Sequence, residues 1–185
     1  MMRKIAICLW LLSCAALCVA QGGSENSKEE SRPDLTGTWV LDRQKTDLAR
    51  FDRDLRRGGI TLIVRHLEPE IRITNKFRSE GKDRAQELVY YTDGRGEENP
   101  LLVTKGVVKS RTLWDGRKLV SKSFSQMRTS RGILQLEALQ KWELSADGRT
   151  LTQTITYGDA SFNPGGRAPL LFAPPPEKRV FNRVP

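Results

Sequence analysis

The sequence predicts an all-β fold, an antiparallel up-and-down barrel of about 8–10 strands with one short N-terminal helix. Apolar and polar residues alternate with a period of two over four runs, which gives each predicted strand one buried and one solvated face. These runs are 60–66, 71–77, 134–144 and 151–157. Asp-Gly pairs, which favour tight type I′ hairpins, follow or precede such runs at 93–94, 115–116 and 147–148. An open β-sandwich is the alternative fold.

Residues 1–20 have the pattern of a secretory signal peptide, with Arg3 and Lys4 followed by an apolar run and small residues before Gln21. The apolar run has 16 residues, fewer than the ~20 that span a bilayer, so we expect cleavage rather than a transmembrane anchor. In a second interpretation, residues 11–14 (LLSC) form an imperfect lipobox and Cys14 carries a lipid.

Cleavage after residue 20 leaves 165 residues with 29 basic and 22 acidic side chains, a net charge of +7. All three cysteines, Cys8, Cys14 and Cys18, leave with the signal peptide. The remaining chain therefore has no thiolate nucleophile, zinc–thiolate site or iron–sulfur cluster. We predict an exported protein, periplasmic or secreted, that is stabilised by core burial without disulfides.

Residues 21–34 lack apolar residues that reach a core and predict a flexible linker, so the folded domain is expected over 35–185. One helix is predicted over 46–57, with Thr46 as its N-cap and Gly58-Gly59 as its end. Its apolar residues at helical spacing are Leu48, Phe51 and Leu55.

The C-terminal region contains a Pro-rich segment, 164–176, within a stretch whose proline density predicts no regular structure over 159–178. Alternation resumes after it, and a last strand is predicted over 179–184.

Two motifs carry a family resemblance: residues 35–39 (LTGTW), which open the first strand, and the hairpin 144–152 (LSADGRTLT). With them the sequence resembles the lipocalin (calycin) superfamily, and in particular the lipocalin-like domains of exported bacterial proteins. The resemblance implies that Gly37 and Trp39 form the Gly-x-Trp motif of the first strand. Trp39 would plug the closed end of the barrel beneath an arginine of the last strand, Arg183 or Arg179. The Pro-rich segment departs from the family pattern.

Several polar side chains fall on the inward faces of the predicted strands, which is typical of a cavity that binds a small molecule. The candidate ligand-binding residues are His66, Asn75, Gln140, Gln153 and Tyr157. His66 is the one histidine and lies on an apolar face; a structural role competes with a role as ligand or general base. On 119–127 the inward face is ambiguous, and Ser121, Ser123 and Ser125 point either into the barrel or out of it.

The predicted function is non-catalytic binding of a small apolar or amphiphilic molecule inside the barrel, with no cofactor, metal site or catalytic residue. We expect no nucleic-acid partner, because the basic residues are spread along the chain, and no membrane-spanning segment in the mature form. The alternative is an envelope-associated protein with a filled barrel whose basic exterior binds an anionic polymer. A third hypothesis is an enzyme that uses His66.

Overall fold

The computed structural model describes residues 32–49, 51, 53–101, 106–129, 132–158, 160–163, 170–172 and 174–185. The predicted signal peptide, Cys14 and most of the predicted linker lie outside the described residues. The elements are β1 (Gly37–Leu41), α1 (Arg53–Gly58), β2 (Ile60–Leu67), β3 (Glu70–Ser79), β4 (Lys82–Tyr91), β5 (Glu97–Pro100), β6 (Val107–Asp115), β7 (Lys118–Thr129), β8 (Gly132–Leu144), β9 (Thr150–Tyr157), β10 (Ala160–Asn163), β11 (Leu170–Phe172) and β12 (Glu177–Val184).

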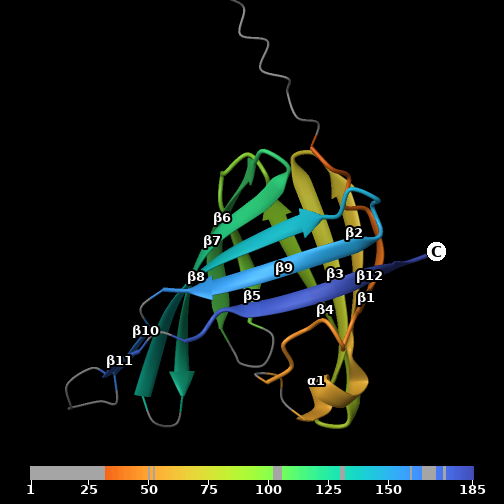
Figure 1. Ribbon diagram of the computed structural model, residues 1–185. Coiled ribbons are helices and arrows are strands. Elements are labelled where there is room, and N and C mark those ends of the chain that lie inside the picture. The colour runs from red at the N-terminus through yellow and green to blue at the C-terminus, as the bar shows by residue number, and fades with distance from the viewer. Residues whose placement is uncertain are drawn as a thin grey trace, which may run out of the picture.

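Ten antiparallel strands follow one another around a nearly closed barrel in the order β4-β3-β2-β1-β12-β9-β8-β7-β6-β5 (Figure 1). Among these ten strands, those consecutive in the chain pair with each other, with two exceptions: β4 and β5 do not pair, and β12 lies between β1 and β9. In this pairing Trp39 of β1 lies opposite Leu62 on one side and Arg183 on the other. The predicted barrel, its up-and-down order and its last strand are confirmed.

The seam of the barrel lies between β4 and β5, the two ends of the strand order, where side chains replace the backbone ladder. The Asn99 side chain accepts a hydrogen bond from Val89 N–H (2.7 Å) and donates one to Val89 C=O (2.8 Å). Gln86 donates to the Pro100 carbonyl at 2.6 Å, and Glu97 Oε2 accepts from Tyr91 N–H at 3.3 Å. The seam is thus closed by amide and carboxylate groups.

The two halves of the barrel wall bury side chains of different chemistry. From β2, β3 and β4 the inward residues are mainly apolar, and Val64 and Ile71 are among the most buried side chains. From β6 to β9 they include Thr112, Ser121 and Gln153, all buried. The buried Ser121 and Ser125 show that the serines of β7 point into the barrel, which decides the ambiguity left by the sequence.

The helix is shorter than predicted: α1 spans six residues, Arg53–Gly58, and not 46–57. Thr46 is not an N-cap, because its hydroxyl group donates to the Val180 carbonyl (3.3 Å) and accepts from Val180 N–H (3.0 Å). Asp47 N–H also donates to Lys178 C=O (2.9 Å). These bonds from the Thr46 hydroxyl and the Asp47 backbone to β12 hold the segment before α1 out of a helix. No helix in the described part of the chain is long and apolar enough to cross a membrane.

The turns differ in detail from the prediction. In the Asp-Gly pairs the glycine alone has a positive φ, for example 74° at Gly94. The loop with two positive φ angles, which a type I′ turn requires, is Glu80-Gly81 between β3 and β4, with φ of 52° and 72°. Asp115-Gly116 and Asp147-Gly148 lie in hairpins as predicted, whereas Asp93-Gly94 connects β4 to β5, which do not pair. The type I′ assignment was wrong for all three pairs.

A further correction concerns the stretch 159–178, which was predicted to have no regular structure. Strand β10 pairs with β8 and with β11, and this small sheet projects from one end of the barrel (Figure 1). The prolines fall at 164, 169 and 174–176. The stretches 160–163 and 170–172 contain no proline. All of their backbone N–H groups are therefore present for the hydrogen bonds of a strand.

Candidate functional site

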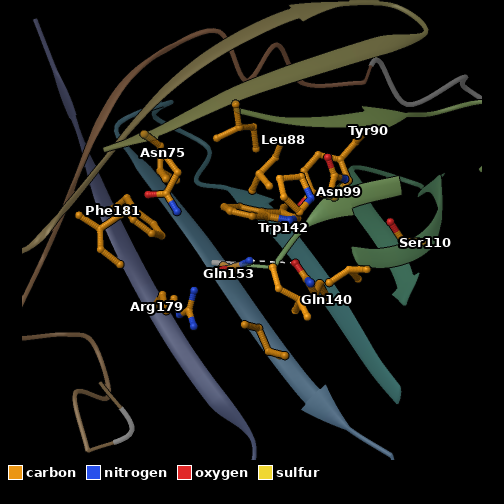
Figure 2. A pocket seen from close by; sticks show the side chains of 17 residues that line it. Asn75, Leu88, Tyr90, Asn99, Ser110, Gln140, Trp142, Gln153, Arg179 and Phe181 are labelled. Carbon is orange, nitrogen blue, oxygen red and sulfur yellow. Dashed lines mark hydrogen bonds between the residues drawn. The ribbon is translucent and has the colours of Figure 1, made fainter. Parts of the chain in front are cut away.

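A cavity of about 200 Å³ lies inside the barrel, between its apolar and its polar wall (Figure 2). Ile60, Leu62, Ile73 and Leu88 line it on the side of β2 to β4. The polar residues in its lining are Asn75, Asn99, Ser110, Gln140, Gln153 and Arg179. An apolar surface with a few convergent polar groups is how small-molecule sites are built.

The polar wall is organised by strand pairing. Gln153 of β9 lies opposite Trp142 of β8 and opposite Arg179 of β12, so the three side chains form one row across the inner face. Gln153 Nε2 donates to Gln140 Oε1 at 3.0 Å (Figure 2). This bond fixes the orientation of both amides, and the row presents indole, amide and guanidinium groups to the cavity.

The charge of Arg179 is balanced within the wall. Its Nη2 lies 3.1 Å from Glu177 Oε1, and the Glu177 side chain is buried. Tyr157 O–H donates to the other oxygen, Oε2, at 2.7 Å. The Phe51 ring covers the guanidinium, with its centroid 5.1 Å from Cζ. The cavity therefore faces an ion pair and not a free cation.

Three buried polar atoms around the cavity have no hydrogen-bond partner in the part of the chain that the structure describes: Asn75 Oδ1, Trp142 Nε1 and Arg179 Nε. Trp142 stacks on Phe181, with ring centroids 6.3 Å apart. Leaving a buried polar atom without a partner costs about 1–3 kcal/mol. One acceptor and two donors are thus available to a molecule in the cavity.

The seam contributes a buried carboxylate beside the cavity. Glu97 Oε1 accepts from Ser110 Oγ (2.7 Å) and Thr112 Oγ1 (2.6 Å), while Oε2 accepts from Tyr91 N–H. Burial, and then the negative charge of Glu97, raises the pKa of Tyr90 to about 12, against an opposing effect of Arg179. Tyr90 therefore lines the cavity as a neutral phenol at neutral pH.

At the other end of the barrel, Trp39 is fully buried and its Nε1–H donates to the Leu35 carbonyl at 3.0 Å. Arg183 covers it, with Cζ 4.5 Å from the ring centroid. Gly37 has φ of 150°, and a Cβ there would lie 3.6 Å from the Arg183 guanidinium carbon. Of the two arginines that the resemblance offered for this contact, the structure places Arg183 on Trp39, and Arg179 faces the cavity.

His66 does not line the cavity, in contrast to the prediction. Its strand face is as predicted, but it lies at the closed end, where Nδ1 accepts from Leu35 N–H (3.3 Å) and Nε2 donates to Glu68 Oε1 (3.0 Å). Asp34 lies 3.6 Å from Nδ1, and the Trp114 ring is 5.8 Å from the imidazole. These contacts tie the segment before β1 to the end of β2, which is a structural role.

The same cluster predicts how acid acts on the fold. Burial of Glu68 acts to raise its pKa, but hydrogen bonds from Thr92, His66 and Trp114 outweigh it and hold the pKa below the ordinary 4.5. A lowered pKa stabilises the folded state above about pH 4.5, and this contribution is lost as the pH falls. We expect Glu68→Gln to flatten the decline in the free energy of unfolding between about pH 5 and pH 3.

The measurement is urea unfolding of both proteins across this range. Glu98→Gln is the control, because Glu98 is exposed and forms an ion pair with Lys109 at 2.9 Å. Profiles of wild type and Glu68→Gln that run parallel would contradict the role assigned to this carboxylate.

Two solved structures are similar to this chain over most of its length. Apo Caenorhabditis elegans lipid binding protein 8 has a TM-score of 0.52 and 12% identity, covering 80% of this chain and 94% of its own. The chain has the calycin β-barrel fold. A structure described as a REP1-NXSQ fatty acid transporter has a TM-score of 0.50 and 13% identity, covering 82% of this chain and 97% of its own. No family model and no curated protein matches the sequence.

The calycin barrel brings three of the five predicted ligand-binding residues together: Asn75, Gln140 and Gln153 all line the cavity. Tyr157 does not line the cavity: its hydroxyl group donates to Glu177, which pairs with the lining residue Arg179. Trp142, Asn99 and Glu177 were not among the predicted site residues, and Arg179 was predicted only as an alternative contact of the plug. For Trp142 and Arg179 a signal was present, since each follows the inward period of its strand.

Proposed function

We propose that this chain is an exported, non-catalytic binding protein that holds a small, partly apolar molecule in its barrel. The observation that carries the proposal is the cavity with three unpartnered buried polar atoms, Asn75 Oδ1, Trp142 Nε1 and Arg179 Nε. The similar structures of a lipid binding protein and of a fatty acid transporter support binding as the use of this fold. Export is supported by the pattern of residues 1–20.

The cavity also favours a binding function over the alternative of an envelope-associated protein, because that alternative assumes a filled barrel. Binding is favoured over catalysis because the charged groups beside the cavity are held by neighbouring side chains of the barrel wall. Arg179 is paired with Glu177, and Glu97 accepts hydrogen bonds from Ser110 and Thr112. A general base must reach the proton it takes, and neither Glu97 nor Glu177 is among the described residues that line the cavity.

Filling the cavity tests the proposal. The probe is 1-naphthylamine, a compact neutral aromatic amine, added to the purified mature protein and followed by calorimetry. Leu88 lines the cavity, so we expect Leu88→Trp to occupy the space and weaken binding at least tenfold while the protein stays folded. Leu113→Trp is the matched control, because Leu113 is 48% exposed on the outer face. Equal affinity in the two variants would refute a site inside the barrel.

A further inference from the structure

The charges around the cavity decide which class of molecule it takes. Arg179 is the one cationic side chain in the cavity lining as described, and Glu177 occupies its Nη2 at 3.1 Å. Tyr157 fixes Glu177 from the other side at 2.7 Å, and Phe51 covers the guanidinium face. A ligand carboxylate would reach Arg179 only beside Glu177, a buried carboxylate whose charge already offsets that of the guanidinium.

The second carboxylate near the cavity makes an anion still less favourable. Glu97 is buried at the seam, and Ser110, which donates to it at 2.7 Å, also lines the cavity. Glu97 forms no ion pair with any residue that the structure describes, and its carboxylate accepts hydrogen bonds from three donors instead. Together Arg179, Glu177 and Glu97 give the cavity surroundings a net charge of −1. Burial is the main cause of the raised pKa of Tyr90, and the negative charge of Glu97 adds to it against the effect of Arg179.

The unpartnered atoms argue against a cation as well. Trp142 Nε1–H and Arg179 Nε–H both need an acceptor, and Asn75 Oδ1 needs a donor. An ammonium group has donors and no acceptor, so it would satisfy Asn75 and leave the two N–H groups unpaired beside the guanidinium. An amide, a urea or a hydroxyl-bearing ring carbonyl offers both kinds of group without charge.

We propose that the cavity selects a compact, uncharged molecule carrying at least one hydrogen-bond acceptor and one donor, and that it discriminates against carboxylates. This inference rests on the proposed function and specifies its ligand class. The volume of about 200 Å³ lies below the ~300–1,000 Å³ of sites for drug-sized molecules. It suits a ring with one polar substituent, and an extended acyl chain exceeds it.

Three probes of one shape and different charge test the proposal: benzamide, benzoate and benzylammonium, each titrated into the mature protein by calorimetry or ligand-observed NMR. We expect benzamide to bind at least tenfold more tightly than either ion. Equal or tighter binding of benzoate or of benzylammonium would overturn the inference and leave the proposed function standing. If none of the three binds and 1-naphthylamine also fails to bind, the proposed function itself is overturned.

A second experiment removes the negative charge of Glu177 beside the cavity. Glu177→Gln removes the partner of Arg179, so we expect benzoate affinity to rise at least tenfold relative to benzamide. The double variant Glu177→Gln/Arg179→Gln removes both charges, keeps amides at both positions and should restore the preference for benzamide; it remains informative if the single variant folds poorly. Glu143→Gln is the matched control, because Glu143 pairs with Lys118 on the exterior at 2.9 Å. An unchanged benzoate-to-benzamide ratio in Glu177→Gln would refute the charge argument.

Discussion

Replacing Trp39 by alanine is expected to lower the free energy of unfolding by about 3–5 kcal/mol. The indole is fully buried at the closed end of the barrel, and its loss leaves a void that strands β1, β2 and β12 cannot close. Two specific contacts disappear with it: the hydrogen bond to the Leu35 carbonyl at 3.0 Å and the stacking of Arg183 at 4.5 Å. Chemical denaturation of the mature protein measures the effect.

Two further variants divide this loss into its parts. Trp39→Phe keeps most of the apolar volume and removes the N–H donor, so a loss of about 1–2 kcal/mol is expected. Arg183→Met keeps an unbranched stem over the ring and removes the cation, with an expected loss of about 0.5–2 kcal/mol. A loss below about 1 kcal/mol for Trp39→Ala would contradict the plug.

Replacing Asn99 by leucine is expected to destabilise the barrel by about 2–3 kcal/mol. Leucine has a similar size but makes neither bond to Val89, so the N–H and the C=O that Asn99 now satisfies at 2.7 and 2.8 Å lose their partners. Because β4 and β5 have no backbone ladder between them, nothing else in the seam replaces these bonds.

Hydrogen exchange identifies the site of the damage. The Val89 amide should exchange at least tenfold faster in Asn99→Leu, whereas amides of β2, remote from the seam, should change only as far as global stability does. Gln86→Leu is the control, since the half-buried Gln86 also crosses the seam but makes one bond there, at 2.6 Å to the Pro100 carbonyl; a loss below about 1 kcal/mol is expected. Unchanged exchange at Val89 would show that the amide does not close the barrel.

The sequence predicted the strands well because their two faces meet different surroundings. Thr152 and Thr154 face outward while Leu151 and Gln153 are buried. Such alternation can be read from the sequence even when the neighbouring strands are not known. The helix was overestimated because the bonds that unwind its first half run from Thr46 to Val180, 134 residues away. The helical spacing of apolar residues over 46–57 gives no information about a contact that far away in the sequence.

For the site, the period of two gives the face of a strand but not the depth along the barrel. Asn75 and His66 were both placed correctly on inward faces, yet Asn75 lies beside the cavity and His66 at the closed end. Asn99 was missed because it lies in a stretch rich in Gly and Pro that predicts a turn. Its role in the seam follows from the way the sheet closes on itself.

The position of β12 has a consequence for how the barrel is made. Because β12 pairs with both β1 and β9, neither of those strands has its second neighbour until the last residues of the domain have been synthesised. A nascent chain with β1 to β9 in place would expose two free strand edges, which are templates for intermolecular pairing. Contacts between the first and last strands also have the largest sequence separation, and such contacts form slowly. We therefore expect folding to begin in the local hairpins and to be completed only when β12 inserts between β1 and β9.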